Sequence, residues 1–236
     1  MQLFYYPTLT ENDEIFNLNK EESAHIIRVN RKTEGDKISI TNGLGFIFIT
    51  EIKTASASKC ELKIVQVIPH NPQSYRLHLA VAPTKMNERF EWFLEKATEI
   101  GIQEITPIIC DNSERRTINL PRYQKIIESA MKQSQKAFLP ILNEPIAFSN
   151  FVKKDFSAQK FIAHCDSEFE KISLKKKIQP AQDCLILIGP EGDFSKKEIS
   201  MATQNLFEGI SLGSTRLRTE TAAVIACHSV VYANEN

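Results

Sequence analysis

The sequence predicts an α/β protein with an additional β-rich domain, and two observations support this prediction. From about residue 75 onward, short apolar strands alternate with amphipathic helices. Strands that are apolar nearly throughout, such as residues 77–83 (LHLAVAP) and 184–189 (CLILIG), are typical of a parallel sheet covered by helices on both faces. The segment before residue 70 is β-rich instead. We therefore expect one domain over residues 1–70 and a second over residues 75–236.

The N-terminal segment predicts a compact β-barrel-like module. Residues 36–53 (DKISITNGLGFIFITEIK) contain two β-rich runs around Asn-Gly, which is a strong hairpin signal. Residues 60–68 (CELKIVQVI) form a further strand, and residues 21–31 (EESAHIIRVNR) are the one helical candidate. Residues 69–74 (PHNPQS) have the composition of a linker.

The second domain is predicted element by element from the same alternation. Helices are expected where apolar residues recur at helical spacing, and the second of them has Pro121 in its first turn. Apolar runs between the helices predict the strands. In chain order after residues 77–83, the expected elements are helix 87–101, strand 104–110, helix 121–137, strand 160–165, strand 184–189, helix 195–205, strand 209–213 and helix 221–233.

Composition limits the classes of function. The chain has 29 acidic and 29 basic residues, so a nucleic acid would have to bind a local basic patch. Its five cysteines have no paired spacing, which argues against a zinc site or a disulfide framework and favours a reducing cytoplasm. The N-terminus does not resemble a signal peptide, and no apolar run approaches the ~20 residues of a membrane span. We expect a soluble cytoplasmic protein that holds no metal.

Two loops that follow predicted strands carry polar residues suited to chemistry. In residues 185–198 (LILIGPEGDFSKKE), two glycines allow the backbone to approach a ligand, although a tight strand-to-helix turn explains them equally well. The glycine spacing fits neither a P-loop nor a dinucleotide fingerprint. The carboxylates of Glu191 and Asp193 favour a ligand with positive charge over a phosphate.

The second loop, residues 212–223 (LGSTRLRTETAA), places arginines just before the last helix. Helix capping would explain the Thr-Glu-Thr that follows them. Capping does not explain Arg216 and Arg218, because cations near the positive end of a helix dipole are unfavourable unless an anion binds there. This loop therefore favours a functional role.

Together these loops resemble the two cofactor loops of the RsmE-type methyltransferases. Members of this family use S-adenosylmethionine to methylate N3 of a uridine in 16S ribosomal RNA, and they belong to the knotted SPOUT class. Three further stretches are similar to family motifs in the same order, so the resemblance covers nearly the whole chain. They are residues 25–38 (HIIRVNRKTEGDKI), 83–108 (PTKMNERFEWFLEKATEIGIQEITPI) and 131–142 (MKQSQKAFLPIL).

Two positions depart from the family pattern. Asp193 stands where the family often has a second glycine after Pro-Glu. Lys136 stands where the family tends to carry an arginine, and this change keeps the charge but loses the bidentate guanidinium.

The resemblance implies a C-terminal SPOUT domain with a trefoil knot, an N-terminal PUA-like RNA-binding β-barrel and a homodimer. It also implies that the loops after strands 184–189 and 209–213 bind S-adenosylmethionine mainly through their backbone. The residues expected to bind this cofactor are Leu187, Gly189, Pro190, Glu191, Gly192, Leu212, Gly213, Leu217 and Thr219.

Methyl transfer to uridine N3 requires loss of a proton from a weak acid. We expect Arg218 to stabilise the developing uridine anion or an adjacent phosphate, and Glu220 to orient the reactants or take the proton. For Glu220, a structural role as a first-turn carboxylate is equally consistent with the sequence.

Small-subunit ribosomal RNA is the expected partner. The residues expected to contact it are Arg28, Arg31, Lys85, Arg115, Arg116, Lys132 and Lys136. A solvated helix face would also explain the charges at residues 28–32. Two other functions stay open: a knotted methyltransferase acting on a ribose 2′-hydroxyl, and a non-catalytic RNA-binding protein of ribosome assembly.

Overall fold

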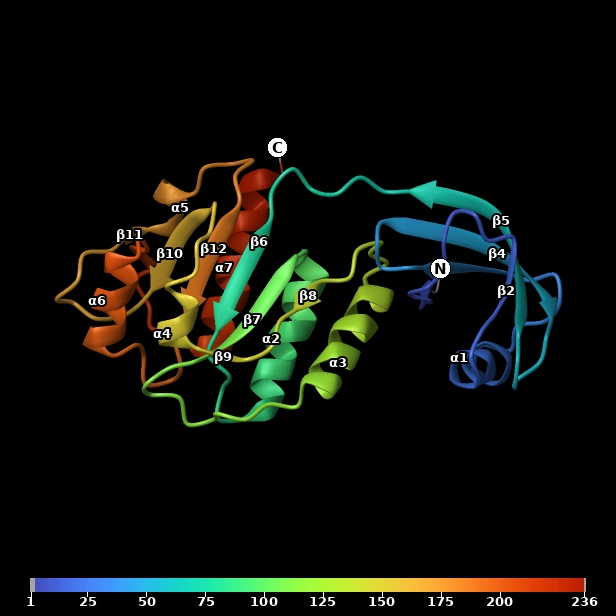
Figure 1. Ribbon diagram of the computed structural model, residues 1–236, viewed down its shortest axis with the longest axis horizontal. Helices are drawn as coiled ribbons and strands as arrows, with labels where there is room; N and C mark the ends of the chain where they lie inside the picture. The colour runs from blue at the N-terminus through green and yellow to red at the C-terminus, as the bar shows by residue number, and fades with distance from the viewer. Residues whose placement is uncertain (1–2, 236) are drawn as a thin grey trace. The chain divides into compact units, whose positions relative to one another are not determined.

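The computed structural model describes residues 3–235, which form two compact units with the helices and strands labelled in Figure 1. The first unit consists of Met1–Pro72 and Glu128–Leu139, and the second of Gln73–Ile127 and Pro140–Asn236. Sequence reasoning placed residues 128–139 with the C-terminal domain, whereas the structure groups them with the N-terminal unit. The predicted domain bounds themselves stay a prediction.

Backbone hydrogen bonds show why residues 128–139 belong to the first unit. The Gly45 amide donates to the carbonyl of Ala137 at 3.0 Å, and the Leu139 amide donates to the carbonyl of Gly43 at 2.9 Å. The Thr41 hydroxyl adds a third bond to the Ala137 carbonyl at 3.1 Å. Pairing between segments this far apart in the chain leaves no periodic signal in the sequence.

The first unit is built on a five-stranded sheet. Its order is β1 (Leu3–Tyr5), β3 (Lys37–Thr41), β4 (Phe46–Thr54), β5 (Glu61–Pro69) and β2 (Ile15–Asn17). Strands β3 and β4 pair antiparallel across Asn42-Gly43, so the predicted hairpin is confirmed. Gly43 has a φ of 73°, a left-handed conformation in which glycine is favoured.

The predicted helix over residues 21–31 is also present, in two parts. Helix α1 (Lys20–Ala24) begins after Asn19, whose side chain accepts a hydrogen bond from the Glu22 amide. A π-helical turn, η1 (His25–Val29), continues it. Ile26 is fully buried in the core of this unit, which holds the helix against the sheet.

The second unit contains a sheet in which every ladder is parallel, as predicted. Its order is β11 (Ile172–Ser173), β13 (Glu208–Ser211), β10 (Gln159–Ala163), β12 (Cys184–Ile188), β6 (Leu77–Val81), β7 (Glu104–Ile109) and β8 (Ile141–Leu142), and β9 (Ile146–Ala147) also pairs with β7. The five strands expected from the sequence are all present. The short strands β8, β9 and β11 were not predicted.

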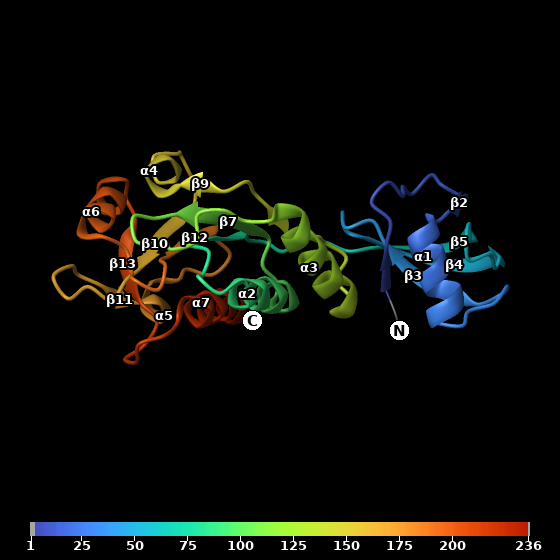
Figure 2. The ribbon, with the colours of Figure 1, turned by 90° about the horizontal axis from the view of Figure 1, so that it is seen from below.

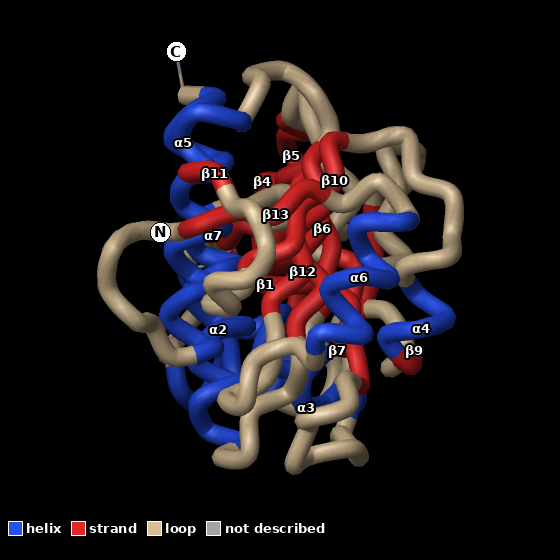
Figure 3. Tube along the Cα trace, turned by 90° about the vertical axis from the view of Figure 1, so that its left-hand side faces the viewer, coloured by secondary structure: helices blue, strands red, loops and turns tan. Residues whose placement is uncertain are grey.

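Helices cover both faces of this sheet. Figures 2 and 3 show α2 (Asn87–Ile100), α5 (Leu174–Lys177) and α7 (Thr219–Asn234) on one face, and α4 (Phe148–Phe151) and α6 (Lys196–Gln204) on the other. The α/β class with layers on both faces is therefore confirmed. Helix α3 (Leu120–Gln133) ends four residues earlier than predicted, and Gln135 just beyond it has a left-handed φ of 56°.

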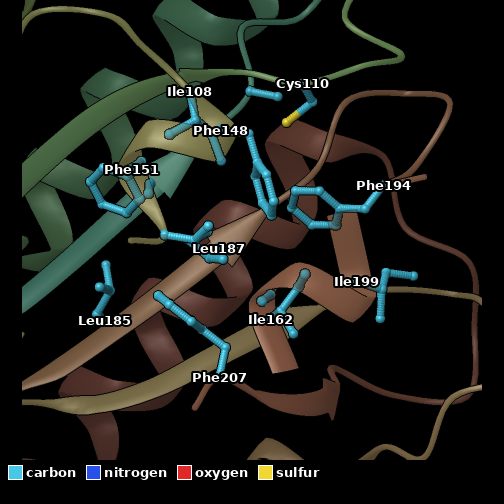
Figure 4. Packing of buried hydrophobic residues seen from close by; sticks show 14 residues of the cluster. Ile108, Cys110, Phe148, Phe151, Ile162, Leu185, Leu187, Phe194, Ile199 and Phe207 are labelled. Carbon is cyan, nitrogen blue, oxygen red and sulfur yellow. The ribbon is translucent and has the colours of Figure 1, made fainter. Parts of the chain in front are cut away.

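An aromatic core lies between the sheet and helices α4 and α6. Phe148 of α4 packs against Phe194, with ring centroids 5.3 Å apart, and Figure 4 shows both rings above Leu187 of β12. Phe194 lies directly after the glycine-containing loop that follows β12. Burial of its ring therefore fixes the end of that loop on a rigid layer.

Two expectations concern topology and membranes. The trefoil knot implied by the family resemblance is not tested by the strand order and stays a prediction. Within residues 3–235, no helix combines the length and the apolar character needed to cross a membrane.

Candidate functional site

A cavity of about 300 Å³ lies at the carboxyl ends of β10 and β12, against the beginning of α7. In open parallel sheets this is the edge where ligands bind. Its volume is at the lower end of the range of small-molecule sites. It is lined by Ala163, Cys165, Ile188, Gly189, Pro190, Glu191, Asp193, Arg216, Leu217, Arg218, Thr219 and Ala222.

Gly189 and Thr219 join two walls of this cavity. The Thr219 hydroxyl donates a hydrogen bond to the Gly189 carbonyl at 3.0 Å. A Cβ at Gly189 would lie 3.1 Å from the Phe194 ring, which is a tight contact, so the ring would have to shift by a few tenths of an ångström to accommodate a larger residue. The glycine predicted from the sequence thus lies at a closely packed position and lines the cavity.

The structure does not show the side-chain helix cap that would explain the Thr-Glu-Thr at the start of α7. Arg218 is the N-cap residue and makes no capping hydrogen bond through its side chain. Thr219 is the first helical residue, and its hydroxyl bonds to Gly189 across the site instead of to a first-turn amide. The Thr219 hydroxyl therefore does not cap the helix, and it connects α7 to the loop after β12.

Charged groups of both signs line the cavity. Glu191 also accepts a hydrogen bond from the backbone amide of Lys85 at 2.8 Å, which ties the loop after β6 to the loop after β12. Arg216 and Arg218 are exposed, and neither makes an ion pair within the part of the chain that the structure describes. Their guanidinium groups are thus available to an anionic ligand.

Glu220 does not line the cavity. Its side chain is buried, and its Oε1 lies 3.9 Å from Nε of Arg89 on α2. Its Oε2 is buried with no hydrogen-bond partner among the described residues. The structure therefore places this carboxylate toward α2, and its predicted role in catalysis stays a prediction.

Four of the residues predicted to bind the cofactor lie outside the cavity wall. Leu187 is fully buried in the aromatic core. Gly192 is exposed, and a Cβ there would lie 3.1 Å from Cβ of Asn112. Leu212 is half-buried and Gly213 is exposed, and both precede the residues that form the wall.

Sequence reasoning missed part of the lining. Ala163 and Cys165 follow from the rule that ligands bind at the carboxyl ends of strands, because they end the strand predicted at residues 160–165. Ile188 ends β12 in the same way. Nothing in the sequence marked Ala222 as a lining residue, because alanine is common throughout helices. Among residues 3–235, no group of three or more His, Cys, Asp or Glu side chains is arranged to hold a metal.

The predicted RNA contacts of the second unit lie in the loops after β6 and β7. Lys85 forms an ion pair with Glu114 at 2.7 Å, and this carboxylate raises the pKa of the Lys85 ammonium. Arg115 donates to the carbonyls of Thr84 and Lys85, so part of its role is to hold these loops together. Arg116 donates to the carbonyl of Asp111 and is exposed.

The other predicted RNA contacts belong to the first unit. Arg28 and Arg31 are exposed, and Arg31 has a left-handed φ of 53° directly after η1. Lys132 is half-buried with its Nζ 3.3 Å from Oε1 of Glu22. Lys136 is half-buried, and its amide donates to the carbonyl of Met131 at 3.1 Å.

The fold and the site define an α/β protein that binds a ligand at the carboxyl edge of a parallel sheet, between glycine-containing loops and two arginines. Comparison with protein families gives the particular class. Residues 71–231 match the family described as the RNA methyltransferase domain, and residues 18–65 match the RNA methyltransferase PUA domain. The chain therefore belongs to the RNA methyltransferase family, and its fold class with an N-terminal PUA-like domain is confirmed.

Relatives match over nearly the whole chain. The ribosomal RNA small subunit methyltransferase E of Rickettsia conorii is 27% identical, covering 97% of this chain and 94% of the relative. The crystal structure of a probable rRNA-methyltransferase from Porphyromonas gingivalis is 38% identical over 99% of both chains, with a TM-score of 0.89. A methyltransferase structure from Legionella pneumophila, in complex with the bound cofactor SAM, is 27% identical over 98% of this chain and 97% of its own, with a TM-score of 0.88.

Proposed function

We propose that this protein transfers a methyl group from S-adenosylmethionine to N3 of a uridine in 16S ribosomal RNA. One observation carries the proposal: a cavity with both acidic and basic groups lies at the carboxyl edge of the sheet, in a chain of the RNA methyltransferase family. Relatives named as small subunit methyltransferases of ribosomal RNA, with similarity along the whole chain, support this substrate. The cofactor follows from the SAM-bound relative.

The residues of the cavity fit this cofactor. Ala163, Ile188 and Leu217 give it apolar walls, which suit an adenine ring. Glu191 and Asp193 give it negative charge, which suits a sulfonium and an ammonium group. When bound, S-adenosylmethionine supplies an electrophilic methyl group on its sulfonium. The backbone of Gly189 and the Thr219 side chain that bonds to it would form part of the surface that holds it.

Arg218 is the residue proposed to act on the nucleotide. Uridine N3–H is a weak acid, so a guanidinium beside the uracil oxygens favours the anion that attacks a methyl group. Arg218 lines the cavity and is exposed, and it pairs with no described carboxylate, so its charge is available for this purpose.

For Glu220, burial favours an orienting role over proton removal. Its carboxylate lies 3.9 Å from Arg89, and Glu220 is the second residue of α7, directly after Arg218 and Thr219. In this position it fixes the first turn of the helix, and through it the two residues that face the cavity.

RNA would be bound by the exposed basic groups near this edge. Lys85 follows β6, which pairs with β12, and Arg115 and Arg116 follow β7, the next strand beyond β6. Each keeps a cationic group at least partly accessible. In the first unit, Arg28, Arg31, Lys132 and Lys136 are the corresponding candidates. Phosphate contacts of this kind fix the position of an RNA without reading its sequence.

We further propose a homodimer that works in the cytoplasm. Helix α7 is apolar around most of its circumference, and it exposes the stacked rings of His228 and Tyr232, 5.8 Å apart, which would suit an interface with a second copy. A ribosomal RNA substrate and five free cysteines support the cytoplasmic location.

A methyl-transfer assay with small-subunit ribosomal RNA tests the proposed function. Wild-type protein should transfer labelled methyl groups from S-adenosylmethionine to uridine N3, and Arg218→Ala should lower kcat by about 10²–10³-fold. Calorimetry should give Arg218→Ala a cofactor Kd within about threefold of wild type, and Arg218→Lys, which keeps the charge, should retain more activity than the alanine variant. Near-normal transfer by Arg218→Ala, with cofactor and RNA affinities unchanged, would refute the catalytic assignment.

A further inference from the structure

Building on the proposed function, we infer that Asp193 is a positioning residue of the cofactor cavity, whose carboxylate fastens the loop after β12 to the loop after β10. The inference concerns the position where this chain departs from the glycine often found in the family. Asp193 lines the cavity together with Cys165, which lies two residues beyond the end of β10.

The backbone of Asp193 is in a conformation that favours glycine. Its φ is 63°, in the left-handed region, and its amide donates to the Pro190 carbonyl at 2.9 Å to close the turn. Aspartate tolerates this region better than most residues, yet glycine adopts it at lower cost. Replacement by glycine therefore tests the contacts of the carboxylate without adding backbone strain.

Both oxygens of the Asp193 carboxylate are used. Oδ2 accepts a hydrogen bond from the Cys165 amide at 2.7 Å, and Oδ1 accepts one from the Phe194 amide at 2.8 Å. Hydrogen bonds to an ionised acceptor are shorter and stronger than neutral ones. The first bond joins two loops that are 28 residues apart in sequence and that both line the cavity.

The other side of the same loop is held separately. The side-chain amide of Asn112, in the loop after β7, donates to the carbonyls of Gly192 and Asp193 at 3.2 Å and 3.0 Å. The following residue, Phe194, is buried in the aromatic core. Because these contacts do not involve the Asp193 carboxylate, its loss should release the Cys165 side of the cavity and leave the loop otherwise anchored.

Asp193→Gly should therefore weaken binding of S-adenosylmethionine without a comparable loss of protein stability. It relieves the left-handed backbone but also removes the two hydrogen bonds of the carboxylate, so the thermal midpoint of the cofactor-free protein should stay close to that of wild type. It removes a charge-assisted bond between two cavity walls, so the Kd for S-adenosylmethionine should rise about tenfold.

Two further variants complete the experiment. Asp193→Asn keeps one oxygen acceptor and the tolerance for a left-handed backbone, and should give an intermediate Kd. Leu206→Gly is the matched control, because Leu206 also has a left-handed φ, of 67°, and is 76% exposed outside the cavity. This control should raise the thermal midpoint and leave the cofactor Kd unchanged.

Hydrogen exchange of the Cys165 amide reports on its hydrogen bond to the Asp193 carboxylate and requires no cofactor. Protection at this amide should be present in wild type and lost in Asp193→Gly, and it should persist in Leu206→Gly. If wild type binds no S-adenosylmethionine, the proposed function fails. The exchange result still shows whether the Asp193 carboxylate holds the two loops together. Unchanged protection at Cys165 in Asp193→Gly, or an unchanged Kd in that variant of a protein that binds the cofactor, overturns the inference.

Discussion

Replacing Thr219 with valine removes one hydroxyl and keeps the shape of the side chain. Thr219 is 5% exposed, and its hydroxyl is the donor that meets the Gly189 carbonyl at 3.0 Å. Without it, a buried carbonyl at the end of β12 loses the donor that α7 supplies. An unsatisfied buried group of this kind costs about 1–3 kcal/mol. We expect Thr219→Val to lower the free energy of unfolding by about 2 kcal/mol, because valine contributes no compensating bond.

Two measurements follow from this estimate. In a chain of this size the thermal midpoint should fall by about 5 °C. The Kd for S-adenosylmethionine should rise about tenfold as well, since the bond joins two walls of the cavity. Calorimetry measures both quantities on the same protein.

Thr98→Val is the matched control. Its hydroxyl is also buried and donates at 2.7 Å to the Leu94 carbonyl within helix α2, away from the cavity lining. This variant should change the thermal midpoint but leave the cofactor affinity as in wild type. Two outcomes would refute the reasoning: wild-type cofactor affinity in Thr219→Val, or an equal loss of affinity in both variants.

Two more predictions concern pH and salt. Burial is the main cause that lowers the pKa of His78 from 6.5 to about 4, so this histidine is neutral when folded. The free energy of unfolding should therefore fall as pH drops from 6.5 toward 4, and urea unfolding of His78→Gln should show a weaker pH dependence than wild type. For RNA, the logarithm of the binding constant should fall with the logarithm of salt concentration, and Arg116→Gln should reduce that slope by about one. An unchanged slope would remove Arg116 from the set of phosphate contacts.

The parallel sheet could be predicted because its strands are buried on both faces. Residues such as those of β12 are apolar without interruption, as expected of a strand that has no solvent-facing side. The hairpin at Asn42-Gly43 was equally clear, because its turn requires a left-handed backbone at Gly43. Local chemistry determined these elements, so the sequence alone was sufficient.

The details of the site depend on contacts between distant segments. The pattern Thr-Glu-Thr predicts a helix cap, but Thr219 bonds to Gly189, 30 residues earlier in the chain. Leu187 was expected beside the cofactor, yet the alternation of side chains along β12 directs it into the aromatic core. The contact between Asp193 and Cys165 is likewise visible only in three dimensions.

The most direct test is mass spectrometry of small-subunit ribosomal RNA from cells of the source organism that lack this protein. The proposed function predicts that one methyl group on uridine N3 disappears, that the wild-type gene restores it, and that Arg218→Ala does not. Ribosomal RNA with its N3-methyluridine intact, or a missing methyl group on a ribose oxygen, would contradict it.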